Sequence, residues 1–71
     1  MNKETLSFSL FIIHAMANRF NISPVAVYHK LKSTACLEKY IIPYYDILHT
    51  QGEDYLIQDI ENYLKNRGVL L

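Results

Sequence analysis

The sequence predicts an all-α fold, in which residues 1–71 form a single helical domain: a compact bundle of four short helices with a helix-turn-helix-like N-terminal half. Three observations predict it. Apolar residues recur at helical spacing along most of the chain, and no stretch alternates with the period of two that is typical of a strand. Start and stop signals, among them Asn21-Ile22-Ser23-Pro24 and Gly68, divide the pattern into short segments. A chain of 71 residues suffices for one domain only.

Residues 4–20 are predicted to form the first helix. Five of its residues follow the spacing of a buried stripe, namely Leu6, Leu10, Ile13, Ala17 and Phe20. Four more apolar residues lie on its other sides: Phe8, Phe11, Ile12 and Met16. A helix that is apolar nearly all round is usually central in a fold or meets a partner. We expect His14, which lies within it, to be a satisfied or rim residue rather than a ligand.

The boundary before the second helix is marked by four residues. Asn21 tolerates the left-handed conformation that ends a helix, and Ser23 is a good N-cap. Pro24 suits the first helical position, where its missing N–H costs nothing. Ile22 and Val27 are spaced to form a hydrophobic staple. The second helix is predicted to run to about Lys32, with Val27 and Leu31 on its inner face.

A third helix is expected near residues 35–49, with a kink or a fresh start at Pro43, which removes a backbone hydrogen bond and crowds residue 39. Its predicted buried set is Leu37, Tyr40, Ile41, Tyr44, Ile47 and Leu48. Thr50 and Glu53 have the spacing of a capping box for a fourth helix, which Gly68 ends. The fourth helix has apolar residues at helical spacing: Leu56, Ile57, Ile60, Tyr63 and Leu64.

Composition favours an interaction partner. Apolar and aromatic residues make up 51% of the chain, and six residues are tyrosines. Because a chain this short cannot easily bury that much apolar surface, we expect a protein partner or a homo-oligomer. Residues 1–39 hold five basic and two acidic residues, whereas residues 40–71 hold two basic and five acidic ones. The two halves could therefore face surfaces of opposite charge, although ordinary solvated helix faces would give the same pattern.

Cys36 is the only cysteine, so an internal disulfide is excluded, and a single thiol fits a reducing, cytoplasmic environment. The apolar run over residues 8–17 is shorter than the roughly 20 residues that a membrane span needs, so we expect no membrane association.

No pattern indicates catalysis. Asp46 and His49 are three residues apart, but the chain has no H-E-x-x-H or paired-carboxylate motif and no glycine-rich phosphate loop. A nucleophilic pair of Cys36 with a histidine has no local support. We therefore expect no enzyme activity, no cofactor and no metal, and we expect Asp46 and His49 to make hydrogen bonds at a helix surface or end.

The N-terminal half has the spacing of a helix-turn-helix, carried by Ala17, Asn21, Ile22, Ser23, Val27 and Leu31. In this interpretation residues 23–32 form the recognition helix, and four side chains face phosphates or base edges: Tyr28, His29, Lys30 and Lys32. The zero net charge weighs against a stand-alone DNA-binding protein, and the same geometry serves plain helix packing in many small domains.

The C-terminal half resembles a known family. The motif Tyr45-Asp46-x-Leu48-His49-Thr50-x-Gly52, followed by Tyr55-Leu56-Ile57-x-Asp59-Ile60 and Tyr63, is similar to the small bacterial family catalogued as domain of unknown function three-seven-nine-one. The resemblance covers about residues 5–66. The family has no established activity, so the role of the signature residues Tyr45, Asp46, Leu48, His49, Thr50 and Gly52 stays open between function and structure.

The resemblance also implies a partner. Members are often encoded beside a larger protein that resembles an ADP-ribosyltransferase-like toxin domain, which suggests an antitoxin or an accessory partner. The basic second helix departs from the more acidic one that is associated with the family, and this departure keeps DNA binding open as an alternative.

Our leading hypothesis is a non-enzymatic protein-interaction module. Four residues of the acidic fourth helix would contact a basic groove, with exposed tyrosines as anchors: Asp54, Gln58, Asp59 and Glu61. The alternative is a DNA-binding regulator that uses residues 23–32. The two hypotheses are compatible, because an antitoxin can also repress its own operon.

Overall fold

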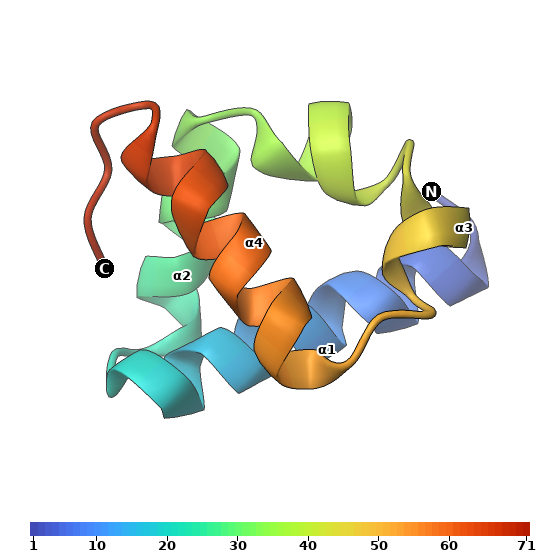
Figure 1. The fold of residues 1–71 in the computed structure, drawn as a ribbon, viewed down its shortest axis with the longest axis horizontal. Coiled ribbons are helices and arrows are strands. Elements are labelled where there is room, and N and C mark those ends of the chain that lie inside the picture. The colour runs from blue at the N-terminus through green and yellow to red at the C-terminus, as the bar shows by residue number, and fades with distance from the viewer.

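The longest helix, α1 (Lys3–Phe20), lies along one side of the molecule, and the rest of the chain folds back over it (Figure 1). The computed structural model describes all residues 1–71. Four further helical segments follow: α2 (Pro24–Ser33), η1 (Leu37–Ile41), α3 (Tyr45–Leu48) and α4 (Glu53–Lys65). The structure contains no strand. The all-α prediction is therefore confirmed, whereas the predicted number of four helices is wrong, because five segments form.

The five segments enclose one hydrophobic core. Helix α2 rises from the C-terminal end of α1, α4 runs diagonally across the middle of the view, and the segment that contains η1 spans the edge opposite α1 (Figure 1). The core residues come from every segment: Ile12, Ile13, Met16, Ala17, Val27, Leu31, Cys36, Leu37, Ile41, Leu48, Leu56, Ile57, Ile60 and Leu64. Helix α4 contributes four of them at the spacing that its sequence predicted.

The buried face of α1 differs from the predicted stripe. Ile13 and Ala17 are buried as predicted, but Leu6 and Leu10 are 49% and 47% exposed. Thr5 and Ser9 are buried instead. The reason is that both hydroxyls find partners close by in the chain: the Thr5 hydroxyl donates to the Asn2 carbonyl at 3.1 Å, and Ser9 donates to the Thr5 carbonyl at 2.7 Å. A satisfied hydroxyl costs little to bury.

The corner between α1 and α2 follows the sequence signals. Asn21 has φ 54° and ψ 48°, which is the left-handed conformation predicted for it. The Ser23 side chain accepts a hydrogen bond from the Ala26 N–H at 3.1 Å, and Pro24 is the first helical residue. Both predicted inner residues, Val27 and Leu31, are fully buried. The start of α2 is therefore set by local chemistry.

The predicted third helix divides into η1 and α3. Ala35 is in the left-handed region with φ 58°, where a residue with a Cβ is strained. The chain then winds as a π-helix, in which the Ile42 N–H donates to the Leu37 carbonyl at 3.0 Å. This wider turn ends directly before Pro43, whose ring would crowd the carbonyl of residue 39 in a continuous α-helix. The predicted break at Pro43 therefore takes the form of a restart at Tyr45.

Burial along this segment was only partly predicted. Leu37, Ile41 and Leu48 are buried, as expected, and Tyr40 is half-buried. Tyr44 and Ile47 are 50% and 61% exposed, so their predicted burial is wrong. The restart after Pro43 changes the rotation of the helix, which turns these two side chains away from the core.

The two ends of α4 differ in how well the sequence predicted them. The predicted capping box of Thr50 and Glu53 does not form. The N-cap is Gly52, which makes no side-chain hydrogen bond, and the Thr50 hydroxyl instead donates to the Ile47 carbonyl at 2.8 Å. At the other end Gly68 adopts φ 79°, and the Val69 N–H donates back to the Leu64 carbonyl at 3.0 Å. Gly68 therefore ends the helical turn, as predicted.

Candidate functional site

Four rings form a continuous row between α1 and α3, which we call the α1–α3 aromatic row: Phe11, Phe8, Tyr45 and His49. The centroids of Phe8 and Phe11 are 6.5 Å apart. Tyr45 meets Phe8 edge to face at 5.3 Å and stacks on His49 at 4.3 Å with an interplanar angle of 8°. Offset and edge-to-face arrangements are the favourable ones for aromatic pairs. This row attaches the four-residue helix α3 to α1.

The remaining signature residues form the corner between α3 and α4. Leu48 is buried, and Thr50 hydrogen-bonds within the last turn of α3. The His49 Nδ1 lies 2.7 Å from the Tyr45 carbonyl, so this nitrogen carries a proton and donates to it. This is a helix-end hydrogen bond, as expected. Gly52 is in an extended conformation, and the space that a Cβ would occupy there is open, so neither strain nor crowding demands glycine.

Asp46 lies apart from these contacts. It is exposed on α3 and makes no side-chain hydrogen bond or ion pair, with His49 or with any other residue. The predicted hydrogen bond of Asp46 at a helix surface or end is therefore absent, and His49 pairs with Tyr45.

A second row lies between η1 and α4, and we call it the η1–α4 aromatic row: Tyr44, Tyr40, Tyr63 and Arg67. Tyr40 stacks on Tyr63 at 5.2 Å with an angle of 13°, and Tyr44 is tilted against Tyr40 at 5.7 Å. The guanidinium carbon of Arg67 lies 3.5 Å from the centre of the Tyr63 ring. A cation over an aromatic face is attracted by the negative face of the ring.

Asp59 is part of the same arrangement. The Tyr40 hydroxyl donates to the Asp59 Oδ2, while Oδ1 has no hydrogen-bond partner. Burial, and after it the Asp59 carboxylate, raises the pKa of Tyr40 to about 12. The tyrosine therefore stays protonated at neutral pH and holds the carboxylate in one orientation.

The other acidic-helix residues predicted to bind a partner also have contacts within the chain. Asp54 forms an ion pair with Arg19. Glu61 lies 3.6 Å from Lys65, and Gln58 donates to Glu61 and Asn62 at 3.4 and 3.3 Å. These groups do not form a bare acidic surface.

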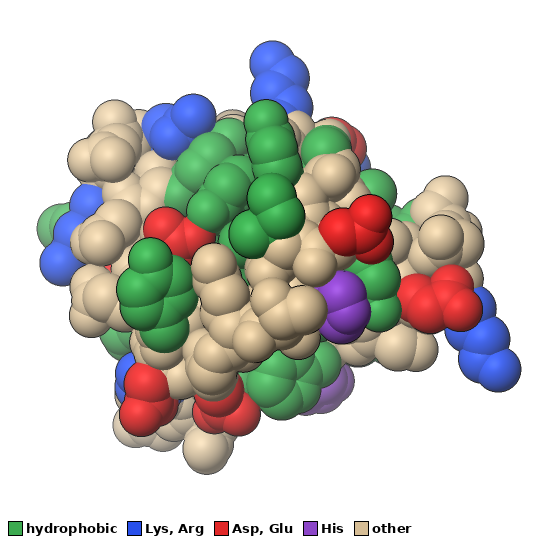
Figure 2. All heavy atoms as spheres, turned by 45° about the vertical axis from the view of Figure 1, so that its right-hand side comes forward, with side chains coloured by type: hydrophobic (Ala, Val, Ile, Leu, Met, Phe, Trp, Pro, Cys, Tyr) green, Lys and Arg blue, Asp and Glu red, His purple; other side chains and the backbone are tan.

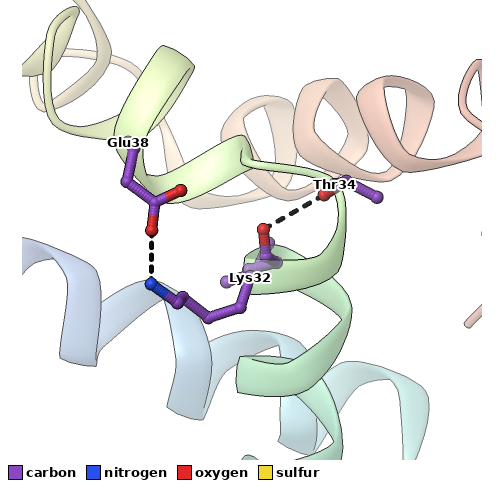
Figure 3. Close-up of polar contacts among 4 residues, drawn as sticks. Lys32, Thr34 and Glu38 are labelled. Atoms are coloured by element: carbon purple, nitrogen blue, oxygen red, sulfur yellow. Dashed lines mark hydrogen bonds and ion pairs between the residues drawn. The ribbon is translucent and has the colours of Figure 1, made fainter.

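The predicted nucleic-acid-binding residues are likewise partly engaged. Tyr28 and His29 are exposed on α2, and their rings are 5.8 Å apart. Lys30 donates to the Leu70 carbonyl at 3.0 Å, and Lys32 pairs with Glu38 at 2.6 Å. Figure 3 shows the Lys32 amine and the Glu38 carboxylate pointing toward each other across the end of α2. The structure thus places both lysines in contacts that connect α2 to later segments.

Charge pairing shifts the ionisation of both partners. A hydrogen bond and the charge of Glu38 raise the pKa of Lys32, and the same hydrogen bond lowers the pKa of Glu38. The Thr34 hydroxyl, also drawn in Figure 3, donates to the carbonyls of the last turn of α2 at 2.9 and 3.1 Å. Together these contacts close the end of α2 before the strained residue Ala35.

Cys36 is fully buried, and burial raises the pKa of its thiol to about 12. A thiol in this state is protonated at neutral pH and is a poor nucleophile. His14 is exposed on α1, which agrees with a rim position. The structure has no group of three or more histidine, cysteine, aspartate or glutamate side chains arranged to hold a metal ion, and no pocket. None of its helices has the length and hydropathy of a transmembrane span.

Sequence reasoning missed the contacts that join separate segments within the two rows. These are the hydrogen bond between Tyr40 and Asp59, the stacking of Tyr40 on Tyr63 and the packing of Phe8 on Tyr45. The only sequence signal was the abundance of tyrosines, because helical spacing reports neighbours within one helix and not between helices.

These features define a small all-helical domain that has two aromatic rows at its surface and a carboxylate held by a tyrosine. The chain belongs to the family described as Protein of unknown function (DUF3791), whose model matches residues 7–67. The resemblance read from the C-terminal motif is thereby confirmed, and the matched range includes every residue of both rows. No curated protein and no solved structure matches the chain.

Proposed function

We propose that the protein is a non-enzymatic interaction module, acting in the bacterial cytoplasm as an antitoxin-like or accessory partner of a larger neighbouring protein. The observation that carries the proposal is the apolar surface that the fold leaves uncovered. Leu6 and Leu10 lie one turn apart on α1 and are each about half exposed. Exposed apolar groups that share a surface are typical of binding sites.

The exposed leucines continue a stripe that is otherwise buried. Ile13 and Ala17 follow at the same helical spacing and are buried in the core, whereas Leu6 and Leu10 are about half exposed. Fully burying a leucine side chain contributes about 1.5–3 kcal/mol, so a partner that covers this end of α1 would gain part of that free energy at each leucine. The family membership supports the same proposal, because the resemblance implies a partner with an ADP-ribosyltransferase-like toxin domain.

A pull-down tests the proposal. The tagged full-length chain is incubated with native lysate at moderate salt, with and without nuclease, and the bound proteins are identified by mass spectrometry. We expect one larger protein in stoichiometric amount under both conditions, and we expect a Leu6→Ser, Leu10→Ser variant to recover less of it. Recovery of no protein in stoichiometric amount would contradict the proposal.

The alternative function is DNA binding through residues 23–32. The specific observation in its favour is the corner before α2, where Asn21 is left-handed and Val27 and Leu31 anchor the helix in the core. A recognition helix needs such an anchor. Against it, Lys30 and Lys32 already contact Leu70 and Glu38.

Salt dependence separates the two functions. DNA binding by α2 predicts an affinity for the promoter of its own gene that falls steeply with salt and is lost when Lys30 and Lys32 are both replaced by glutamine. Absent or salt-insensitive binding would exclude this alternative.

A further inference from the structure

One surface combines four tyrosines with a single oriented carboxylate. We call it the tyrosine–aspartate patch: Tyr40, Tyr44, Tyr55, Asp59 and Tyr63. Tyr55 and Tyr63 lie one turn before and one turn after Asp59 on α4, so they flank the carboxylate on the same helix face. Tyr40 and Tyr44 border it from η1 and the segment that follows. Figure 2 shows hydrophobic side chains gathered on one face of the molecule, with acidic side chains to either side.

The patch is open to solvent at its edges. Tyr44 is 50% exposed and Tyr55 is 66% exposed, so both rings can contact a partner. Tyrosine supplies a large, rigid contact area at low entropic cost and is enriched at the energetic centres of interfaces.

The Asp59 carboxylate at the centre of the patch is oriented and has one oxygen free to accept a hydrogen bond from a cation. Tyr40 holds the Asp59 Oδ2, and Oδ1 is left without a partner. Asp54 and Glu61 form ion pairs with Arg19 and Lys65, whereas Asp59 forms none. The patch therefore offers a fixed acceptor between aromatic surfaces, and its charge complements a basic partner.

Within the chain, one ring of the patch already binds an arginine side chain. Arg67 lies over the Tyr63 ring at 3.5 Å while it donates a hydrogen bond to the Tyr63 carbonyl at 3.2 Å. A planar guanidinium stacks on an aromatic face and still donates in its own plane, whereas the ammonium of lysine does not combine the two in this way.

From this arrangement we propose that the tyrosine–aspartate patch docks an arginine-bearing segment of a partner protein, with the guanidinium donating to the Asp59 Oδ1 and lying against Tyr44 or Tyr55. This inference rests on the proposed interaction function, and it adds a second contact surface to that of Leu6 and Leu10 and the chemistry of the partner segment that binds there. It also narrows the predicted binding set, since Asp59 remains in it while Asp54 and Glu61 have ion-pair partners of their own.

The test uses the full-length protein and a synthetic probe of defined chemistry. The ¹⁵N-labelled chain is titrated with a peptide of alternating arginine and glycine, and with matched lysine and glutamate peptides, at two salt concentrations. We expect shift changes centred on the patch, weaker binding of the lysine peptide and no binding of the glutamate peptide. Equal affinity for the arginine and lysine peptides, or changes centred elsewhere, would overturn the proposal.

Two variants localise the binding. Asp59→Asn keeps an oxygen for the Tyr40 hydroxyl but removes the charge, and we expect about tenfold weaker binding, the equivalent of about 1.4 kcal/mol. Tyr55→Ala, at a position too exposed to disturb folding, should weaken binding several-fold.

The matched controls are Glu53→Gln, an exposed acid of the same helix without an ion pair, and Tyr28→Ala, an exposed tyrosine of α2. Equal losses in the controls and the patch variants would show diffuse attraction and overturn the proposal.

The outcomes also separate this inference from the proposed function. If the wild-type chain recovers a partner and both patch variants recover it equally well, the proposed docking at the patch is wrong, while the interaction function stands. If the peptide binds at the patch but no partner is recovered, the interaction function fails while the chemistry of the patch stands. Self-association that Asp59→Asn disrupts, measured by analytical ultracentrifugation, would assign the patch to a second copy of the chain and overturn the arginine proposal.

Discussion

The two aromatic rows are built from similar rings but differ in what surrounds them. The α1–α3 row attaches a short helix to the longest one, and its only polar contact is the bond from His49 to a backbone carbonyl. The η1–α4 row contains a charged group at its end and an oriented carboxylate beside it. Stacking alone therefore does not define a site. The first row holds the four-residue helix α3 against α1, while the second lies beside a carboxylate oxygen that has no hydrogen-bond partner.

The largest effect should come from Phe8, which connects the first row to the core. Phe8→Ala removes the contacts with Tyr45 and Phe11 and leaves a gap beside partly buried side chains. We expect the free energy of unfolding in urea to fall by about 2–3 kcal/mol, somewhat less than for a fully buried phenylalanine. Phe11→Ala, at the exposed end of the same row, is the control and should cost less than about 1 kcal/mol. Equal losses would mean that the row does not anchor α3 through Phe8.

A smaller effect is expected from Tyr40, which holds the carboxylate of the second row. Tyr40→Phe keeps the ring stacking and removes the hydrogen bond to Asp59. Because the pair is partly open to water, we expect a loss of about 1 kcal/mol, which is less than the roughly 1.5–3 kcal/mol of a typical hydrogen bond to a charged group. Thermal unfolding monitored by circular dichroism measures it. An unchanged stability would indicate that water replaces the tyrosine at no cost.

The same residue predicts a response to alkaline pH. The pKa of Tyr40 is raised from 10.0 to about 12, so its protonated form is favoured by folding. This contribution to stability is fully present below pH 10 and is lost as the pH rises through about 12. In a series of urea unfolding curves between these values, the wild type should lose stability faster than Tyr40→Phe. Parallel curves for the two proteins would contradict the contribution assigned to Tyr40.

The smallest effect concerns the strained residue that leads into the second row. Ala35→Gly should stabilise the protein by up to about 1 kcal/mol, because glycine adopts a positive φ without steric cost. The gain is reduced by the greater freedom of glycine in the unfolded chain. Asn21→Gly should give less, since asparagine already tolerates the left-handed region. A loss of stability in Ala35→Gly, measured by urea unfolding, would show that its methyl group contributes more by packing than it costs in strain.

The residues also show what the sequence could and could not predict. Ser23, Pro24 and Gly68 act within a few residues of themselves, so their effects were predicted correctly. Leu6 and Tyr44 were assigned to the core incorrectly, because the face of a helix that becomes buried depends on where other helices pack. Thr50 had the spacing for a capping box but bonded to the preceding turn instead.

The candidate site was less predictable than the fold. Asp59 was in the predicted binding set because it is acidic, but nothing near it in the sequence indicated that Tyr40 would orient it. The stacking of Tyr45 on His49 could in principle be read from their spacing of four residues in one helix, whereas the packing of Tyr45 on Phe8 depends on the tertiary fold.

The division of roles between the structural α1–α3 row and the tyrosine–aspartate patch is tested most directly by measuring one variant in two ways. Tyr55→Ala changes an exposed ring of the tyrosine–aspartate patch that lies outside the hydrophobic core. We expect a several-fold loss of affinity for the arginine–glycine peptide, with a free energy of unfolding within about 0.5 kcal/mol of the wild type. Unchanged affinity together with a clear loss of stability would contradict this division, because the patch would then be structural, like the α1–α3 row.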